Sequence, residues 1–519
     1  MNAATSVPSM SVTSMSVASA AGTVPAPIPP GFLIVPDPDT TQCGTDTLVG
    51  GSPGRVLRLS ATGRAAWAEL QRGPVASRAA GLLARRLTDA GLAHPRPPAG
   101  VTPGDVTVII PVRDRAASLD RCLGALGQGN RVVVVDDGSL APRAVADVAA
   151  RHGAALIRRS VNGGPAAARN TGLADATTDV IAFLDSDCLP PPDWIMRLGR
   201  HFADPCVGAV APRIVADRSR TAAGRYAAAA GSLDLGPDEA RVVPTSRVAY
   251  VPTAALLVRR GGLLDIAGAS AGDAGISGAG VFDEGLRFGE DVDLIWRLHR
   301  AGWRVRYDPA VQVRHREPDS WRGLLARRFH YGTSAAPLAR RHPAALAPLV
   351  VTPEAALAVT GLLTGRPSLA AAGLAATVAR TRGALRAAGL PRTDGTRKSV
   401  ASIYRTWLGA GRYGTQLASP LLAAALVLPG GRNPRRRRVA VASLLLGPAV
   451  AGWATRRPRL DPGRFVLGAI ADDIAYGAGV WVGCARNRTT GPLRPVLARR
   501  SWRADSAESA RPSSRKICP

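Results

Sequence analysis

The middle of the chain alternates between short apolar runs and amphipathic stretches. Apolar runs at 106–112, 131–135, 155–157 and 180–184 contain few polar residues, so they predict strands that are buried on both faces. The stretches between them place apolar residues three and four positions apart, as helices do. Strands that alternate with helices at this spacing form a parallel sheet with right-handed crossovers. We therefore expect an α/β domain over residues 105–330.

The N-terminal part has a different pattern. Residues 47–59 predict two short strands around a Gly-Pro turn, and two helices follow, the first with Ser60 as its N-cap. Residues 31–96 should therefore form a small α+β unit. Its β-β-α-α order resembles the winged-helix-like domains that hold the leader peptide in pathways that modify ribosomally made peptides; a cap packed on the next domain is the alternative. The proline- and serine-rich residues 1–30 predict a disordered tail.

Beyond residue 330 the apolar stretches are rich in alanine. Several are shorter than the roughly 20 residues that a membrane span requires. Residues 435–438, however, are four consecutive arginines beside such a stretch, as at a cytoplasmic membrane boundary. We expect residues 331–490 to be helical and to associate with the cytoplasmic side of the cell membrane through one or two spans or shallow helices. The alternative is a helical bundle with arginines on its solvated faces. Residues 491–519 predict a second disordered tail.

Composition narrows the possible partners. The apolar content of 46% excludes disorder throughout, and the net charge of +28 comes almost wholly from arginine, which suits phosphates, carboxylates and anionic lipid surfaces. Aromatic residues do not alternate with the basic ones and no zinc-finger spacing occurs, so we predict no nucleic-acid partner. The six cysteines lack paired spacing, which argues against a disulfide framework or a zinc site and favours a reducing compartment.

Two carboxylates end the most apolar of the predicted strands. Asp185 and Asp187 directly follow the run 180–184, and because side chains alternate along an extended chain, both project to the same side. Open α/β sheets bind their ligands at the carboxyl ends of their strands. Two oxygen ligands there suit a hard divalent cation, Mg²⁺ or Mn²⁺, that also carries water and a diphosphate. A solvated turn after a strand is the alternative.

Two further segments have the composition of a ligand site. Asp136 or Asp137 ends the second strand, where a carboxylate can accept hydrogen bonds from a base or a ribose. Gly163 and Gly164 permit a close approach of the backbone, and the helix that begins after them offers free N–H groups to an anion.

The order of these motifs is more specific than any one of them, and it resembles the family 2 glycosyltransferases. The segments that carry the resemblance are 110–112, 136–139, 162–164, 169–172, 185–187, 278–284 and 289–298. The resemblance implies a nucleotide-diphospho-sugar transferase domain of the Rossmann-like, GT-A type. That domain would bind a nucleotide sugar donor and a divalent metal, between the small N-terminal unit and a helical, membrane-associated C-terminal region.

The resemblance also implies roles for individual residues. Asp185 and Asp187 would hold the metal and the diphosphate, with His315 as a further ligand, unless His315 is a plain surface histidine. The general base would be Asp291, and Glu290 would orient the helix end or the acceptor. The residues on the donor side would be Pro111, Asp114, Asp136, Asp137, Gly163, Gly164, Arg169, Asn170 and Asp185.

The chemistry of glycosyl transfer agrees with these roles. A sugar hydroxyl needs a carboxylate to take its proton while a metal stabilises the departing diphosphate. One base and one leaving group imply a single in-line displacement, and hence inversion at the anomeric carbon. At the first turn of a helix Asp291 should favour its ionised form, although acidic residues are favourable at that position in any protein.

Three departures from the family pattern bear on these expectations. Arg113 and Asp114 stand where the family often has Asn-Glu, which affects the nucleotide-side contacts. The glycine- and alanine-rich insert 267–280 is long and is expected to form a loop over the acceptor. The Gln-x-x-Arg-Trp signature of processive enzymes does not occur, so we do not expect a synthase that extrudes its polymer.

The whole arrangement resembles the glycosyltransferases of mycofactocin systems, through residues 49–55, residues 250–259 and the apolar tail. That resemblance implies UDP-glucose as donor and β-1,4-linked glucose units on a peptide-derived redox cofactor. Two alternatives remain open at this point. A cell-envelope transferase, for example one that uses dTDP-rhamnose, would share the catalytic motifs, and a non-catalytic binding protein would share the fold without needing both sets of carboxylates.

Overall fold

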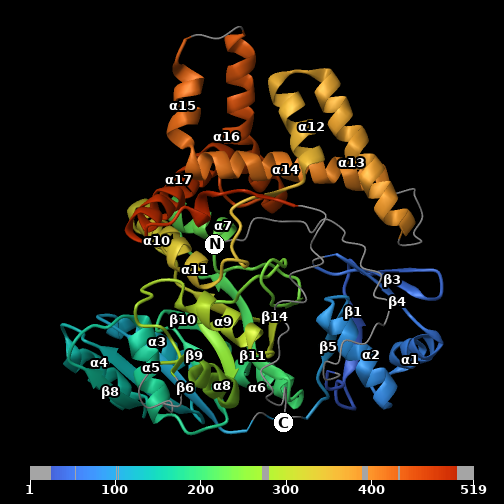
Figure 1. The fold of residues 1–519 in the computed structure, drawn as a ribbon. Coiled ribbons are helices and arrows are strands. Elements are labelled where there is room, and N and C mark those ends of the chain that lie inside the picture. Colours follow the sequence, from blue (N-terminus) through green and yellow to red (C-terminus); the bar gives the residue numbers. More distant parts are fainter. Residues whose placement is uncertain are drawn as a thin grey trace.

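The structure is a computed structural model, and it describes residues 25–52, 54–100, 102, 104–271, 280–387, 395–429 and 433–498. Three parts are visible in Figure 1: a small N-terminal unit, a central α/β domain beside it, and a helical C-terminal region above the central domain. Most of both predicted tails, and most of the insert 267–280, lie outside the described residues.

A nine-stranded sheet forms the centre of the molecule. Its strands follow the order β10-β14-β11-β13-β9-β6-β7-β8, and β12 pairs with β14. The strands are β6 (Val106–Val112), β7 (Arg131–Asp137), β8 (Ala155–Arg159), β9 (Val180–Leu184), β10 (Cys188–Leu189), β11 (Val207–Ala216), β12 (Ala240–Arg241), β13 (Ala255–Arg259) and β14 (Arg304–His315).

Strand direction differs between the two halves of this sheet. Strands β8, β7, β6 and β9 are parallel, as their apolar runs and intervening helices predict. Strand β13, in contrast, is antiparallel to both β9 and β11, so the whole sheet is mixed, while the predicted parallel arrangement holds for the four strands from which it was inferred. A strand buried on both faces has the same apolar pattern in either direction, because only the connection between strands fixes the direction.

Helices cover both faces of the sheet and complete two apolar cores. Ile109 and Phe183 belong to the core on one face, and Ile110 and Val134 to the core on the other. The helices of this domain are α3 (Ala116–Leu126), α4 (Pro142–Arg151), α5 (Pro165–Asp175), α6 (Trp194–Gly199), η1 (Arg200–Ala203), α7 (Ala222–Ala230), α8 (Arg260–Ala271) and α9 (Glu290–Arg300).

The N-terminal unit packs on the central domain. Arg85 donates two hydrogen bonds of 2.7 Å to Asp204, and both side chains are buried. Ser60 caps the first helix, as predicted, by accepting a hydrogen bond from the amide of Gly63. The elements are β1 (Leu33–Pro36), β2 (Thr41–Cys43), β3 (Thr47–Gly50), β4 (Arg55–Arg58), α1 (Ala61–Arg72), α2 (Arg78–Asp89) and β5 (Ala93–Arg96).

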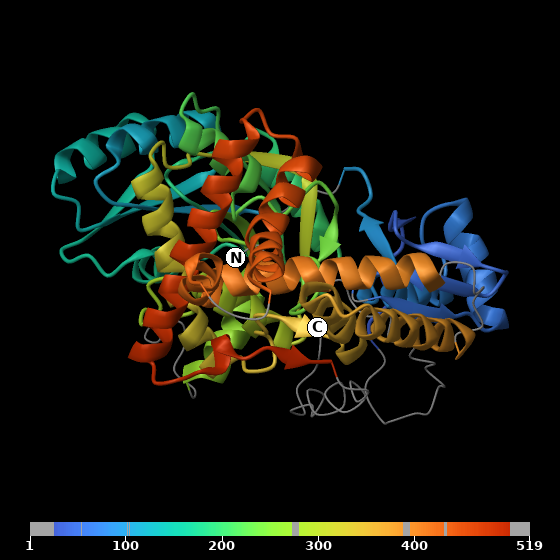
Figure 2. The same cartoon turned by 90° about the horizontal axis from the view of Figure 1, so that it is seen from above.

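The C-terminal region is helical, as predicted. One hairpin consists of α12 and α13 and a second of α15 and α16; both rise from α14 on the side away from the central domain (Figure 1), and Figure 2 shows them from above. The elements are α10 (Trp321–Thr333), α11 (Ala335–Arg341), β15 (Val350–Val351), α12 (Pro353–Thr364), α13 (Pro367–Ala387), α14 (Gly395–Leu417), α15 (Ser419–Val427), α16 (Pro434–Arg456), α17 (Pro462–Arg486), η2 (Gly491–Leu493) and β16 (Val496–Leu497).

The described ends of both predicted tails contact the rest of the fold. Ile28 is only 1% exposed in the core of the N-terminal unit, and its amide donates to the carbonyl of Gly81. At the other end, β16 pairs with β15 in parallel register. The proline-rich composition of residues 1–30 gave no sign of the Ile28 contact. One buried isoleucine is enough to anchor a short segment.

Candidate active site

The metal-side residues meet where β9 ends. Cys188 of β10 pairs with His315 of β14, and this register brings the imidazole beside the preceding carboxylate. The Nε2 atom of His315 lies 3.4 Å from Oδ1 of Asp187. His315 is 4% exposed, so the alternative of a plain surface histidine is wrong.

Charged neighbours determine the protonation of this pair. Burial lowers the pKa of His315, but its hydrogen bonds to Asp187 and Glu317 outweigh burial and raise the pKa to about 9. Burial raises the pKa of Asp187, but His315 and then Arg115 outweigh it and hold that pKa well below the usual range. The pair is therefore an imidazolium and a carboxylate near neutral pH.

The carboxylates of Asp185 and Asp187 are suitable ligands for a divalent cation, but each is paired with an arginine here. Nη1 of Arg115 lies 2.5 Å from Oδ2 of Asp187, and the Arg115 side chain is 57% exposed. Asp185 is partly exposed beside it. Within the residues that the structure describes, no three His, Cys, Asp or Glu side chains are grouped as metal ligands. A cation held by Asp185 and Asp187 would replace the exposed guanidinium of Arg115.

A buried arginine joins the metal-side carboxylate to the carboxylate that precedes the predicted base. Nη2 of Arg169 donates to Oδ1 of Asp185 at 2.7 Å, and Nη1 donates to Oε1 of Glu290 at 2.8 Å. The Arg169 side chain is 3% exposed and its guanidinium lies 5.6 Å from the ring centre of Phe282. Arg169 thus fixes the distance between the end of β9 and the start of α9.

Helix α9 presents two adjacent carboxylates to the site. Its N-cap, Gly289, has a φ of +81°, which favours glycine, and a Cβ there would make a tight contact of 3.0 Å with the side chain of Leu338. Oδ1 of Asp291 accepts a hydrogen bond of 2.8 Å from the amide of Val292. Glu290, by contrast, is tied to Arg169.

Burial controls the protonation of both carboxylates. Burial and the charge of Asp291 raise the pKa of Glu290 to about 7, although Arg169 opposes the shift. Burial also raises the pKa of Asp291, against the opposing hydrogen bond from Val292. The expectation that the helix N-terminus would favour the ionised form of Asp291 is wrong in its net direction, because desolvation outweighs the helix terminus. A raised pKa suits a group that must accept a proton.

The carboxylates at the end of β7 hold loops. Oδ1 of Asp137 accepts from the amide of Gly163 at 2.9 Å, and Oδ2 accepts from the amide of Gly164 at 2.7 Å. Asp136 accepts from the amide of Ser139 and from Arg158. Both aspartates are buried, so a base or ribose would contact the loops that they hold rather than their carboxylate oxygens.

Asp114 is the more accessible acid on this side. Its φ is +53°, its amide donates to the hydroxyl of Ser139, and its carboxylate accepts from the amide of Leu140 while staying 37% exposed. Pro111 is the next-to-last residue of β6 and lies opposite Val135 of β7. Asp114 therefore lies just beyond the carboxyl end of β6, where a ligand can reach it.

Asn170 faces the segment before α9. Its amide nitrogen donates to the carbonyl of Phe282 and to Glu284, and its side-chain oxygen accepts from the amide of Phe282. Asn170 therefore fixes the backbone that leads from the insert to α9, although we predicted it on the donor side.

Sequence reasoning missed the contribution of α11. Nε2 of His342, which follows α11, lies 2.8 Å from Oδ1 of Asp293, and Arg341 pairs with Asp283. These contacts hold the first turn of α9 and the segment before it. No spacing signal connects residue 342 to residue 293, so only the folded chain reveals the pair.

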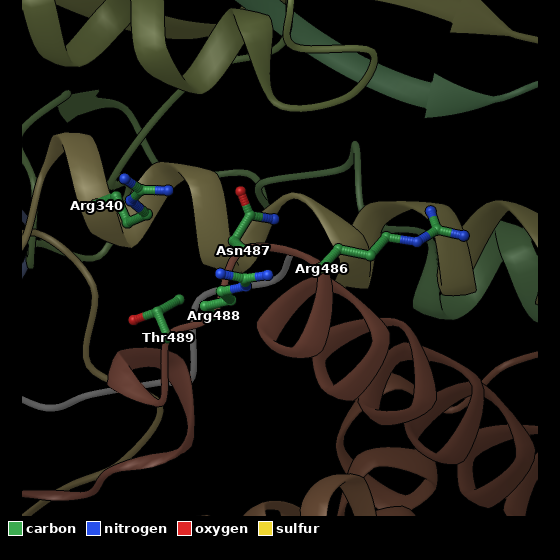
Figure 3. A pocket seen from close by; sticks show the side chains of 5 residues that line it. All are labelled: Arg340, Arg486, Asn487, Arg488 and Thr489. Carbon is green, nitrogen blue, oxygen red and sulfur yellow. The ribbon is translucent and has the colours of Figure 1, made fainter.

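A separate cavity of about 400 Å³ lies where α11 meets the chain that follows α17. Figure 3 shows Arg340 on one wall, near Asn487 and Arg488, while Arg486 extends away from them. Thr489 completes the lining. None of these five residues belongs to the carboxylate site described above.

Comparison with known proteins identifies clear relatives. Residues 107–261 match the family described as Glycosyl transferase family 2. Over 487 residues the chain is 40% identical to the pre-mycofactocin glycosyltransferase of Mycobacterium tuberculosis strain H37Rv, which covers 91% of this chain and 98% of the relative. A shorter match of 33% identity over 103 residues, 18% of this chain and 33% of the relative, links it to the glycosyltransferase AglE of Haloferax volcanii.

Solved structures give more distant matches. The mannosyltransferase PcManGT from Pyrobaculum calidifontis, in complex with GDP-Man and Mn²⁺, is 21% identical with a TM-score of 0.35, over 67% of this chain and 88% of that one. The S. aureus TarS fragment 1–349 is 14% identical with a TM-score of 0.33, over 66% of this chain and 92% of that one.

Proposed function

We propose a reaction for this chain, which belongs to the family 2 glycosyltransferases and, within them, to the pre-mycofactocin glycosyltransferases. It transfers glucose from UDP-glucose to pre-mycofactocin, a peptide-derived redox cofactor. The transfer inverts the anomeric carbon and forms a β-1,4 linkage. The match covers the N-terminal unit and the helical C-terminal region as well as the central domain, which supports a shared acceptor. The single observation that carries the chemistry is the Asp185–Arg169–Glu290 bridge, which holds the metal-side carboxylate and the start of α9 in one site.

On the donor side, Asp185 and Asp187 would hold a divalent cation, Mg²⁺ or Mn²⁺, with His315 as a further ligand once the cation displaces the proton that the imidazolium carries in its absence. When bound, the cation supplies positive charge to the departing diphosphate. Asp114 accepts a hydrogen bond from the nucleoside. The loop of Gly163 and Gly164, which Asp137 holds in place, lies against the donor.

On the acceptor side, Asp291 takes the proton of the attacking sugar hydroxyl. The acceptor oxygen forms its bond to the anomeric carbon as the bond from that carbon to the diphosphate oxygen breaks, and the proton passes to the carboxylate. Asp291 is the better base because its carboxylate accepts from its neighbour's amide and forms no ion pair among the described residues, while Glu290 is held by Arg169. One displacement on one face inverts the anomeric carbon.

Attachment to the cytoplasmic side of the cell membrane forms part of this proposal. Helices α16 and α17 are long and apolar enough to cross a membrane, but α17 packs closely on α10 of the catalytic side, where Gly332 and Gly479 face each other. The arginines at 435–438 lie at the end of α16 that is far from the central domain (Figure 1). A span by α16 would place them across the membrane from the catalytic domain, against the positive-inside rule. Shallow, peripheral attachment avoids this conflict.

Two experiments test these proposals. The purified chain with Mg²⁺ or Mn²⁺ should transfer glucose to pre-mycofactocin from UDP-glucose and not from UDP-galactose, GDP-mannose or dTDP-rhamnose, as mass spectrometry of the product shows. Use of dTDP-rhamnose alone would instead make it a rhamnosyltransferase. In fractionated cells the chain should sediment with membranes and be released by a carbonate wash; retention after the wash would indicate a span, and a wholly soluble chain would refute attachment.

A further inference from the structure

A cavity of about 640 Å³ opens between the tips of the two helical hairpins. One wall comes from the end of α12, the opposite wall from the start of α16, and Trp407 of α14 contributes to the lining. A volume of this size accommodates a small-molecule ligand. The residues that line it are Leu362, Leu363, Gly365, Trp407, Asn433, Arg435, Arg436, Val439, Ala440 and Ser443.

The polar side of this cavity is cationic. Arg435 and Arg436 are exposed, and neither forms an ion pair with a carboxylate in the part of the chain that the structure describes. Residues 355–460 contain seventeen arginines and lysines and one acidic residue, Asp394. Such an excess of positive charge repels itself, and an anion between the arginines relieves the repulsion. Guanidinium groups bind phosphate through paired hydrogen bonds.

Asn433 and Ser443 are polar, but most of the remaining lining is apolar and open to solvent. Leu362 is 65% exposed and Val439 is 64% exposed, one on each hairpin. Trp407 belongs to the residue type that favours the boundary between lipid and water. A free inorganic anion would bind the arginines and leave the apolar walls exposed to water. A ligand with an anionic group and a hydrocarbon part would contact the arginines and the apolar walls together.

We propose that this cavity binds the phosphate-bearing headgroup of an anionic phospholipid. Arg435 and Arg436 bind the phosphate, and Leu362 and Val439 contact the hydrocarbon next to it. This inference rests on the membrane attachment proposed above and adds a defined lipid site at the hairpin tips. The tips face away from the central domain, so a lipid surface reaches this cavity without blocking the carboxylate site (Figure 1).

The second arginine-lined cavity supplies a matched control. It also contains exposed arginines, Arg340 and Arg488, but its remaining walls are polar, with Asn487 and Thr489 (Figure 3). The double variants Arg435→Gln/Arg436→Gln and Arg340→Gln/Arg488→Gln remove the same charge from two places. Only the first should weaken lipid binding if the hairpin cavity is the site.

The experiment is co-sedimentation of the full chain with vesicles of phosphatidylcholine, with and without phosphatidylglycerol. The wild type should bind only the vesicles that contain phosphatidylglycerol. Arg435→Gln/Arg436→Gln should bind them about thirtyfold more weakly, since each arginine near an anionic surface contributes about fivefold, and the control pair should bind like the wild type. Ala440→Phe, which fills the cavity without changing charge, should also weaken binding, and transfer in vesicle-free solution should be unchanged in the Arg435→Gln/Arg436→Gln variant.

Several outcomes would overturn the lipid site. Equal loss in both double variants, or full binding by Ala440→Phe, would mean that charge spread over the surface is responsible. Displacement of the vesicles by millimolar inorganic phosphate at constant ionic strength would mean a free-anion site. If the chain transfers sugar but binds no vesicles, the lipid site is refuted and the proposed reaction is unaffected.

Discussion

Replacing Asp291 by asparagine tests the assignment of the base. The substitution keeps the size of the side chain and an oxygen that can accept the 2.8 Å hydrogen bond donated by the amide of Val292, but it removes the proton-accepting carboxylate. A positioned general base contributes about 10²–10⁴-fold. We expect kcat to fall at least a hundredfold, equivalent to about 2.7 kcal/mol of transition-state stabilisation.

The pH profile separates this role from a structural one. Burial raises the pKa of Asp291, so the acidic limb of log kcat/KM should bend above the usual range of an aspartate. Asp291→Asn should lose that limb. It should also lower the pKa of Glu290, since the charge of Asp291 is one of the causes that raise it to about 7.

The assay measures product formation and donor binding on one preparation. UDP-glucose should bind Asp291→Asn as it binds the wild type, by calorimetry with metal present, while transfer is lost. Asp120→Asn, on the surface of α3, is the matched control and should transfer normally. Normal transfer by Asp291→Asn, or a loss explained entirely by weaker donor binding, would refute the assignment of the base.

Three further outcomes are expected. Chelation of divalent metal, or Asp187→Asn, should abolish transfer while circular dichroism stays native; activity of Asp187→Asn in metal-free buffer would contradict the metal site. In metal-free buffer, the raised pKa of His315 should stabilise the fold by on the order of 3 kcal/mol. This stabilisation should be complete below about pH 6.5 and lost as pH rises through about 9. The variant His315→Gln should therefore show a flatter dependence of melting temperature on pH in that window. Arg85→Gln leaves the buried carboxylate of Asp204 unpaired and should cost about 3–5 kcal/mol, whereas the exposed Arg86→Gln should leave thermal unfolding unchanged.

The parallel half of the sheet was predictable because its strands are long apolar runs with carboxylates at their ends. The direction of β13 was not predictable, because the apolar pattern of a fully buried strand is the same in a parallel and an antiparallel pair. The same limit applies to side chains: the sequence placed Asp137 at the mouth of the sheet, but only the fold shows that both its oxygens accept from Gly163 and Gly164. Arg169 is the clearest case, because its partners are 16 and 121 positions away.

Two consecutive arginines of α10 connect the active site to the C-terminal helices. Nη1 of Arg327 lies 2.9 Å from Oε2 of Glu317, whose other oxygen holds His315, while Arg328 pairs at 2.7 Å with Asp472 of α17. Deleting the C-terminal helices would therefore leave Arg328 without its carboxylate and uncover the face of α10 that α17 buries. Activity lost in such a truncation would not show that membrane contact is needed for catalysis, because α10 also supports His315. Substitutions at the hairpin tips change the surface proposed to bind lipid and leave α10 intact, so they separate the two effects.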